Sequence, residues 1–258
     1  MKKSVLLEKL ISMTGKSKEE IEPSLTHIHI QLCGVSGEGG RFGEASIPSE
    51  YSSLFLDNAP AKDAQKTIFK QLEKYVESFK RFYTERQEGD PMPVKSVYLW
   101  SEAKGNGKSS TASALLNEFM MVGWKASVAL NHPWFKPPAY FFDVNEFQTL
   151  YNKFTRHGIA TILAEDASLA YYEMMEKASN APLIVFDDIG VRSATEAFRA
   201  DLHTIINKRI VNGLPSIYTS NHPLDYLSEV FDERLADRVR DNCIVMEFKG
   251  QSKRGVKK

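Results

Sequence analysis

The segment "WSEAKGNGKSS" (Trp100–Ser110) nearly matches the phosphate-binding pattern G-x-x-x-x-G-K-[ST]. In such a loop, consecutive backbone N–H groups turn inward around the phosphates. Gly105 and Gly107 stand where a Cβ would clash or where φ must be positive. Lys108 can reach the β- and γ-phosphates of a nucleotide, and the Ser109 hydroxyl can ligate Mg²⁺. The residues expected to surround the phosphates are Gly105, Asn106, Gly107, Lys108, Ser109 and Ser110.

The pattern is broken at its first position, where Glu102 replaces glycine. That position lies farthest from the γ-phosphate and mainly eases the turn out of the preceding strand, so glutamate is tolerable there if it faces solvent. A carboxylate at the mouth of the loop could instead repel a phosphate. On this motif alone, the loop is a working nucleotide site, a decayed one, or a chance loop rich in glycine and lysine.

A second motif places two carboxylates at the end of a strand. "LIVFDDIG" runs four apolar residues into Asp187 and Asp188, which is typical of a buried parallel strand. Because side chains alternate along a strand, adjacent carboxylates serve different purposes. Asp187 is the candidate to hold Mg²⁺, and Asp188 is the candidate to orient an attacking water. A helix N-cap or a turn is the structural alternative, but the upstream loop favours a working nucleotide site.

Apolar periodicity predicts the elements that position these residues. Strands are expected at Val94–Trp100 and Ala139–Val144, and within "APLIVFDDIG", "LPSIYTSN" and "CIVMEF". Helices are expected at Lys62–Glu85, directly after the glycine loop, and within "NEFQTLYNKF", "TEAFRADLHTIINKRI" and "DERLADRV". The loop thus follows a strand and precedes a helix, as its chemistry requires. Because strands and helices alternate, we predict an α/β fold with a parallel central sheet covered on both faces.

Residues 1–45 are expected to form a small unit in front of a main domain at residues 46–258. Residues 3–13 carry apolar side chains on one helical face. "THIHIQLCGV" alternates apolar and polar residues, which predicts a half-buried strand. "GVSGEGGRFGEASIP" holds five glycines and predicts a linker or loop.

The amino-terminal unit also contains three potential metal ligands, His27, His29 and Cys33. A structural zinc site needs four ligands. The two histidines would share one face of the expected strand, and we expect that face to be solvated.

The composition is that of a soluble globular protein, with 42% hydrophobic and 26% charged residues over 258 positions. No apolar run is long enough to cross a bilayer, and Glu8 interrupts the apolar stretch near the start. Neither a membrane span nor a secretory signal is expected. Cys33 and Cys243 lie far apart, which favours a reducing cytoplasm. With a net charge of zero, nucleic-acid binding would need a local basic patch.

Five segments, in this order and spacing, resemble the AAA+ ATPase domain of bacterial helicase loaders of the DnaC/DnaI type. They are "GNGKSS", "LIVFDDIG", "LPSIYTSN", "ERLADRVRD" and "FKGQSKR". "EASIPSEY" resembles the segment that leads into the same domain. The resemblance covers roughly residues 45–254 and implies the three-layer fold of the P-loop NTPases with a small amino-terminal appendage. Glu102 and the shortness of the amino-terminal unit are its two departures.

The resemblance also implies roles for several polar residues. Asn221 matches the sensor-1 position, which helps to place the water beside the γ-phosphate. Arg238 matches the arginine finger that reaches the γ-phosphate of a neighbouring subunit, a role that suits a planar and permanently charged side chain. Arg234 lies four residues earlier on the same helical face and could share that role. Arg254 matches a sensor-2-like arginine that acts within its own subunit, and a surface ion pair is the alternative for each arginine.

The implied activity is hydrolysis of ATP with Mg²⁺, for which the candidate catalytic residues are Lys108, Asp188, Asn221 and Arg238. The implied function is to load a hexameric replicative helicase of the DnaB type onto single-stranded DNA. Residues 1–45 would grip the helicase, and copies of the chain would associate through the ATP interface. Candidate DNA contacts are Lys125, His132, Trp134, Lys136, Lys153, Arg156 and His157. The alternatives are a transposition-helper ATPase, which binds duplex DNA and a transposase, and an adaptor that has lost turnover.

Overall fold

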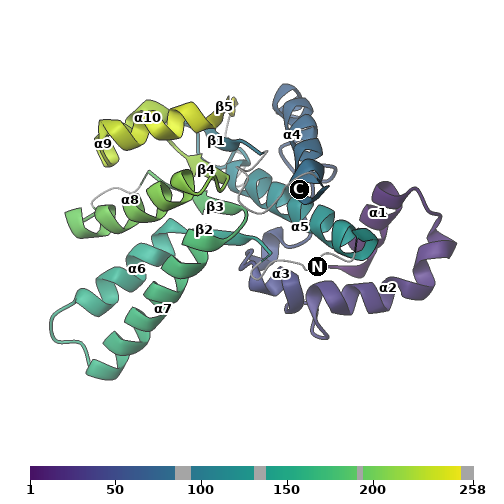
Figure 1. The fold of residues 1–258 in the computed structure, drawn as a ribbon, viewed down its shortest axis with the longest axis horizontal. Helices are drawn as coiled ribbons and strands as arrows, with labels where there is room; N and C mark the ends of the chain where they lie inside the picture. Colours follow the sequence, from purple (N-terminus) through teal and green to yellow (C-terminus); the bar gives the residue numbers. More distant parts are fainter. Residues whose placement is uncertain (85–93, 131–137, 191–193, 251–258) are drawn as a thin grey trace.

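The computed structural model describes residues 1–84, 94–130, 138–190 and 194–250. Within these ranges the chain is built around a five-stranded parallel sheet with the order β2-β3-β4-β1-β5 (Figure 1). The strands are β1 (Ser96–Trp100), β2 (Tyr140–Asp143), β3 (Ile184–Asp187), β4 (Ser216–Ser220) and β5 (Cys243–Glu247). Each lies in a segment where the sequence predicts a strand.

Neighbouring residues along a strand enter two separate hydrophobic clusters, one on each face of the sheet. Val97 and Leu99 of β1 belong to the first cluster, whereas Tyr98 between them belongs to the second. Val185 and Phe186 of β3 divide in the same way. Both faces are therefore buried, as expected of a parallel sheet.

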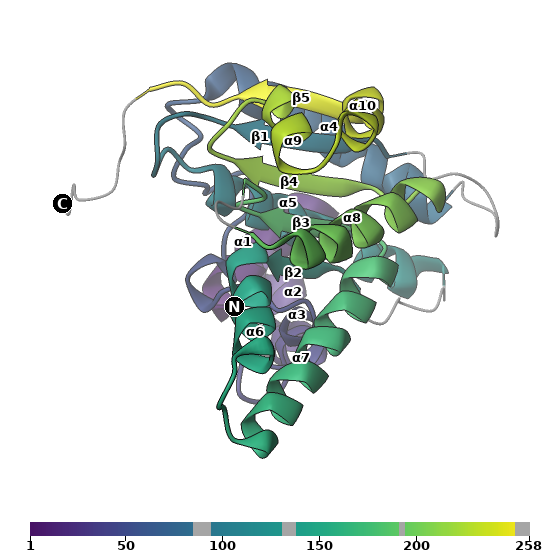
Figure 2. The ribbon, with the colours of Figure 1, turned by 90° about the vertical axis from the view of Figure 1, so that its left-hand side faces the viewer.

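Helices cover both faces and complete three layers, which confirms the predicted fold class (Figure 2). One layer contains α1 (Lys3–Thr14), α2 (Lys18–Cys33), α3 (Gly40–Glu44), α4 (Lys66–Thr84) and α5 (Lys108–Leu130). The other contains α6 (Val144–Thr155), α7 (Thr161–Asn180), α8 (Glu196–Val211), α9 (Leu227–Val230) and α10 (Glu233–Asn242). Short 3₁₀ helices lie at Ser49–Tyr51 and Leu224–Tyr226. No helix in the described ranges is both long enough and apolar enough to cross a membrane.

The strand predicted within "THIHIQLCGV" is wrong, because residues 26–33 belong to α2. A capping box starts the helix: the Ser17 hydroxyl accepts from the Glu20 N–H, and the Glu20 carboxylate accepts from the Ser17 N–H. The buried residues then follow a helical period and not a period of two, so that Ile30 is 43% exposed. His27 and His29 do not share a face, because they are two residues apart on a helix. His27 is exposed as expected, but the expectation of a solvated face is wrong for His29, which is buried.

Two further segments differ from expectation. The glycine-rich segment is not wholly a loop, since Gly40–Glu44 forms α3. α7 is a long helix that the sequence analysis did not predict. Together α6 and α7 form a hairpin that extends away from the β2 edge of the sheet (Figure 2).

The amino-terminal helices pack against α5 (Figure 1). Leu6 and Leu10 of α1 are buried in the same hydrophobic cluster as Phe119 of α5. The Lys125 ammonium of α5 also donates a hydrogen bond of 2.6 Å to the carbonyl oxygen of Met13. The boundary near residue 45 stays a prediction, and residues on its two sides share one core.

Candidate nucleotide-binding site

The carboxyl ends of β1, β3 and β4 meet at one edge of the sheet, which is where α/β folds bind ligands. A cavity of about 540 Å³ lies at this edge. It is lined by the loop between β1 and α5 and by the residues that end β3 and β4. A lead-in segment (residues 49–61), which precedes α4, forms the remaining wall. Asn145 of α6 also lines the cavity, so several parts of the chain that are distant in sequence form one site.

The glycines of the loop have the backbone geometry that the pattern requires. The φ angle is 74° at Gly105 and 100° at Gly107, in the region that disfavours a Cβ. A Cβ added to Gly107 would also lie 2.5 Å from the Cβ of Ala61 in the lead-in segment. Because α5 begins at Lys108, the N–H groups of its first turn lie beside the cavity and can bind anionic oxygens.

Glu102 is exposed to solvent and does not line the cavity. Its φ angle is not positive: in the described ranges, the non-glycine residues with positive φ are Ser46 and Asp188. The first loop position therefore does not require glycine. Both observations agree with the expectation that glutamate is tolerable here when it faces solvent, and its effect on ATP binding stays a prediction.

The Lys108 side chain is buried inside the loop. Its ammonium donates hydrogen bonds to the carbonyl oxygens of Ser101 and Ala103, at 3.4 and 3.3 Å. It also donates to Oδ1 of Asn221, at 3.1 Å. A phosphate oxygen beside this ammonium would accept a stronger, charge-assisted hydrogen bond than a neutral carbonyl does.

A chain of hydrogen bonds continues from Lys108 to Asp188, which follows β3, and to Asp187 at the end of β3. The Asn221 amide, which accepts from Lys108, donates to Oδ1 of Asp188 at 3.0 Å. The Asp188 N–H donates to the Thr219 hydroxyl at 2.8 Å, and that hydroxyl donates to Oδ1 of Asp187 at 2.6 Å. The structure thus brings four predicted site residues into one network through Thr219.

Asp188 has a left-handed backbone conformation, with φ at 58°. This conformation costs a residue other than glycine about 1 kcal/mol or more. Such strain persists when surrounding contacts hold it, and here Thr219 holds the N–H and Asn221 holds the carboxylate. The left-handed turn places the Asp188 side chain differently from that of Asp187, so the two carboxylates can have separate roles.

Burial raises the pKa of Asp187 above its usual range. Hydrogen bonds from Thr219 and Ser109 lower this pKa, and the nearby carboxylates of Asp143 and Asp188 raise it. Ser109 and Asp187 therefore present two neighbouring oxygen donors, which is the donor type that Mg²⁺ prefers. In the part of the chain that is described, no group of three or more His, Cys, Asp or Glu side chains could hold a metal by itself. The remaining oxygen ligands of Mg²⁺ would have to come from phosphates and water.

Two of the predicted arginine residues, Arg234 and Arg238, lie away from the nucleotide cavity. Arg238 of α10 donates a hydrogen bond to Oδ1 of Asn207 in α8, and it is not among the residues that line the nucleotide cavity. Arg238 and the exposed Arg234 both line a surface groove between α8 and α10. Arg254 lies outside the described residues.

The candidate DNA contacts are divided among several places. Lys153 and Arg156 are exposed at the end of α6 and at the turn that follows it. His157 follows them, whereas Lys125 contacts the amino-terminal unit. The candidates His132, Trp134 and Lys136 lie outside the described residues.

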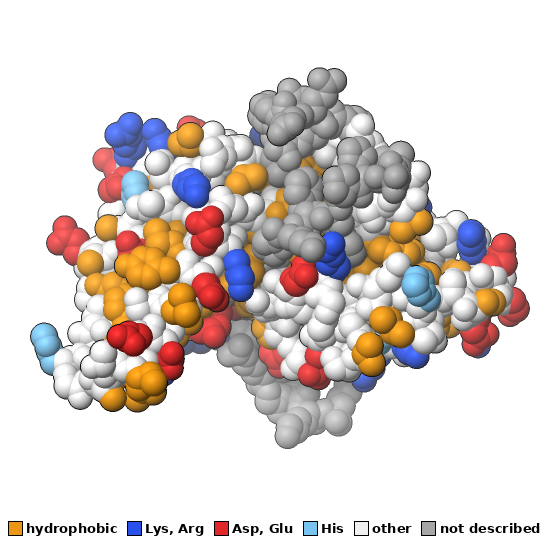
Figure 3. Space-filling view, turned by 60° about the horizontal axis from the view of Figure 1, so that its bottom comes forward, with side chains coloured by type: hydrophobic (Ala, Val, Ile, Leu, Met, Phe, Trp, Pro, Cys, Tyr) orange, Lys and Arg blue, Asp and Glu red, His pale blue; other side chains and the backbone are white. Residues whose placement is uncertain are grey.

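The outer face of α7 does not have the composition of a phosphate-binding surface. Ile162, Leu169 and Tyr172 are exposed on it. The exposed acidic side chains of α7 are Glu165, Asp166, Glu173 and Glu176. Figure 3 shows hydrophobic and acidic side chains intermingled on the side of the molecule that α6 and α7 form. Lys153, Arg156 and His157 lie near the tip of the hairpin, whereas the exposed Lys177 lies in the last turn of α7.

Sequence reasoning missed two components of the site. Thr219 stands inside "LPSIYTSN", two residues before Asn221, and lies within the buried strand β4. The apolar wall of Tyr51, Leu54 and Pro60 was also missed, although "EASIPSEY" marks where the segment begins. Thr219 is identified by the structure, in which its hydroxyl donates to Asp187 although the two residues are far apart in sequence.

No family model matches the chain, and no curated protein matches it. Solved structures do match. A DnaI structure aligns with a TM-score of 0.54 at 20% identity, covering 82% of this chain and 99% of its own. A primosome component from Streptococcus pyogenes serotype M3 aligns at 0.51 and 20% identity, covering 83% and 97%. The structure of the DnaC helicase loader aligns at 0.52 and 17% identity, covering 78% and 100%.

A structure of the replication initiator DnaA also matches, over about half of the DnaA chain. AMPPCP-bound DnaA from Aquifex aeolicus aligns at a TM-score of 0.50 and 14% identity, covering 80% of this chain and 51% of DnaA. At these identities the likeness shows the fold alone. It confirms the fold that the resemblance in the sequence implies. The chain has the AAA+ P-loop NTPase fold that helicase loaders of the DnaI and DnaC type share with the DnaA initiator.

Proposed function

We propose that this protein is an ATPase that loads a hexameric replicative helicase onto single-stranded DNA. The observation that supports it most is the hydrogen-bonded network in the cavity, which joins Lys108, Asn221 and both carboxylates of β3. Each member matches a role that hydrolysis of ATP needs. The fold likeness to helicase loaders supports the choice of helicase loading over other reactions of P-loop proteins.

In this proposal the loop and the first turn of α5 bind the phosphates of ATP, and Lys108 stabilises negative charge on the β- and γ-phosphates. Ser109 and Asp187 would hold Mg²⁺, which when bound neutralises phosphate charge. Asp188 orients the attacking water, and Asn221 fixes the position of the Asp188 carboxylate through the hydrogen bond described above. Arg238 acts on the nucleotide of a neighbouring copy, and Arg254 on that of its own chain.

The proposed partners are a DnaB-type helicase, single-stranded DNA and further copies of the chain. The matched DnaC structure is that of a helicase loader, and a matched DnaA structure is bound to AMPPCP and single-stranded DNA. The amino-terminal unit carries two exposed apolar side chains, Ile30 and Val35, which suit a protein contact. We propose the unit as the helicase-binding part, acting in the cytoplasm.

Phosphate release in the presence of single-stranded DNA tests the enzymatic half of the proposal. Lys108→Ala should abolish hydrolysis and weaken ATP binding. Asp188→Asn should retain binding and lose most of the hydrolysis, and asparagine also tolerates the left-handed conformation at this position. Wild-type turnover by Asp188→Asn would contradict the assigned role. A wild-type protein that binds ATP without releasing phosphate would instead favour the adaptor.

Association with a purified DnaB-type helicase tests the other half. Full-length protein with Ile30→Glu and Val35→Glu should bind ATP normally but fail to bind the helicase. Leu169→Glu, at an exposed leucine on α7, is the matched control and should bind both. Binding to a transposase and duplex DNA, with none to the helicase, would favour the transposition-helper alternative.

A further inference from the structure

Lys9 of α1 makes an ion pair with Glu118 of α5 inside the protein. The two atoms Lys9 Nζ and Glu118 Oε1 lie 2.6 Å apart, and the side chains are 8% and 6% exposed. Asp57, a residue of the lead-in segment, is the second acidic partner of Lys9, at 3.6 Å. The amino-terminal unit therefore supplies a cation to the interior of the ATPase fold.

The same Glu118 carboxylate also holds the lead-in segment. It accepts a hydrogen bond of 3.3 Å from the Leu56 N–H. The Lys9 ammonium lies 4.8 Å from the centre of the neighbouring Phe55 ring, which is a cation–π contact. Lys9 thus stabilises the Glu118 carboxylate, which accepts from the Leu56 N–H, and it also contacts Phe55, the residue before Leu56.

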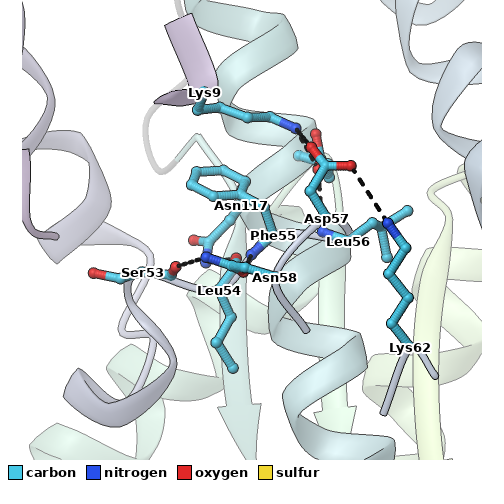
Figure 4. A network of polar contacts seen from close by, with 10 residues as sticks. Lys9, Ser53, Leu54, Phe55, Leu56, Asp57, Asn58, Lys62 and Asn117 are labelled. Carbon is cyan, nitrogen blue, oxygen red and sulfur yellow. Dashed lines mark hydrogen bonds and ion pairs between the residues drawn. The ribbon is translucent and has the colours of Figure 1, made fainter. Parts of the chain in front are cut away.

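Asn117, the residue before Glu118 in α5, holds the start of the segment. Its amide donates hydrogen bonds to the carbonyl oxygens of Tyr51 and Leu54, at 3.0 and 2.7 Å. Asn58 closes the turn by accepting from the Phe55 N–H at 2.7 Å (Figure 4). Two adjacent α5 side chains therefore fix the backbone of residues 51–56.

This segment forms the wall of the nucleotide cavity opposite the phosphate loop. Tyr51, Leu54, Pro60 and Ala61 line the cavity. Ala61 approaches Gly107 so closely that the loop has no space for a Cβ there. A shift of the lead-in segment would therefore change the space that is available to a nucleotide.

Removal of the Lys9 charge would leave Glu118 buried beside Asp57 with no cation. Burial raises the pKa of Glu118, and Lys9 opposes this effect. A buried carboxylate that has lost its partner must take up a proton or move toward water. Either change weakens its hydrogen bond to the Leu56 N–H, because a neutral or displaced acceptor binds a donor less strongly.

We propose that Lys9 is a positioning residue of the nucleotide site and that it couples the amino-terminal unit to nucleotide binding. Lys9 acts through Glu118 on the wall at residues 51–61. Anything that displaces α1, such as a partner bound to the amino-terminal unit, loosens this wall and weakens nucleotide binding. Because coupling is reciprocal, a bound nucleotide holds α1 in place to the same degree. This inference rests on the proposed binding of ATP.

The test compares full-length Lys9→Met with Lys62→Met, measuring the affinity for a fluorescent non-hydrolysable ATP analogue. Lys62 pairs with the same Asp57, at 3.9 Å, but its side chain is 38% exposed whereas that of Lys9 is 8% exposed. Lys9→Met should weaken binding roughly tenfold and raise KM for ATP while leaving kcat nearly unchanged. Lys62→Met should bind like the wild type, and the conservative variant Lys9→Arg should retain most of the affinity.

The double variant Lys9→Met/Glu118→Gln separates positioning from loss of folding. Its glutamine can still accept from the Leu56 N–H, and it leaves no unpaired charge inside the protein. The double variant should therefore bind the analogue more tightly than Lys9→Met alone, whether or not the single variant is destabilised. Equal affinities for Lys9→Met and the wild type would overturn the inference, as would a double variant no better than the single one.

Amide hydrogen exchange in the wild type gives a second measurement. The analogue should slow exchange in α1, and unchanged exchange there would contradict the coupling. The measurements also distinguish failure of the proposed function from failure of the coupling through Lys9. If the wild type does not bind the analogue, the proposed function fails. If the wild type binds it, Lys108→Ala does not, and Lys9→Met binds as the wild type does, the coupling alone fails.

Discussion

A single buried hydroxyl, that of Thr219, contacts the Asp187 carboxylate and the backbone N–H of Asp188. It orients Asp187 by donating to it and fixes the backbone of Asp188 by accepting from its N–H. Thr219→Val keeps the shape of the side chain but removes both hydrogen bonds. We expect kcat for ATP hydrolysis to fall about tenfold, since a hydrogen bond to a charged group contributes about 1.5 kcal/mol or more.

Two variants serve as controls for Thr219. Thr219→Ser keeps the hydroxyl and should restore most of the activity. Ser220→Ala removes the next hydroxyl along β4, which accepts from the His222 N–H and contacts neither carboxylate. Its kcat should stay near that of the wild type, and an equal loss in Ser220→Ala and Thr219→Val would show that general packing of β4 matters and not orientation.

Glu102→Gly tests whether the altered loop is a weakened one. Because Glu102 faces solvent with an ordinary φ, glycine at this position should change the free energy of ATP binding by less than about 1 kcal/mol. Calorimetric titration of ATP measures this change. Glu102→Gln removes the charge without adding backbone freedom and should behave in the same way. A much larger gain in affinity in both variants would identify a repelling carboxylate and revive the adaptor.

The roles of individual residues were predictable where a sequence motif specifies both the residue types and their spacing. Lys108, Asp187 and Asn221 belong to short segments whose ends meet because parallel strands end at the same edge. Thr219 and Lys9 were not predictable, because each acts on a carboxylate that is remote in sequence. Each is identified by a contact between two elements of the fold, and the spacing of residues along the sequence does not reveal such a contact.

At the scale of elements, the periods of apolar residues located the sheet but misassigned one helix. The strands were predictable because buried parallel strands are short apolar runs between turns. α2 was misassigned because Ile28 and Ile30 alternate with polar residues over a few positions. The capping box at Ser17 and Glu20 was the stronger signal, since it satisfies backbone donors that only a helix start leaves unpaired.

Arg209 joins several elements on the α8 side of the sheet. Its guanidinium is fully buried and donates to the carbonyl oxygens of Ala178, Ala181 and Pro215 and to the Ser216 hydroxyl. Burial lowers the pKa of Arg209 to about 9, so its charge is held at a cost that these hydrogen bonds offset. The end of α7, α8 and the start of β4 are thereby fixed to one another.

Arg209→Met should reduce the free energy of unfolding by about 3 kcal/mol, because it leaves three buried carbonyl oxygens without a donor. Urea denaturation followed by circular dichroism measures this change. Lys208→Met, at the exposed neighbouring residue, is the control and should stay within about 0.5 kcal/mol of the wild type. A similar small effect for Arg209→Met would mean that water or repacking satisfies the carbonyl oxygens.

At the scale of the whole molecule, the nucleotide cavity and the groove that contains Arg238 are separate features. Arg238 donates to Asn207 and does not line the cavity of its own chain. An arginine that stabilises the transition state must touch the γ-phosphate. If Arg238 has that role, it must reach the cavity of another copy, and the active enzyme must then be an assembly.

Arg238→Ala should therefore leave ATP binding by a dilute monomer intact and depress hydrolysis by the assembly on the order of 10³-fold. Mixing supplies the decisive measurement. Arg238→Ala subunits retain a phosphate site with Lys108, and Lys108→Ala subunits retain the finger, so a mixed interface can contain both intact halves. Phosphate release should reappear in the mixture although neither variant has activity alone. Loss of ATP binding by the Arg238→Ala monomer would instead mean that Arg238 acts within its own chain. The shared site would then have to be abandoned, and Arg234 in the same groove would become the candidate finger.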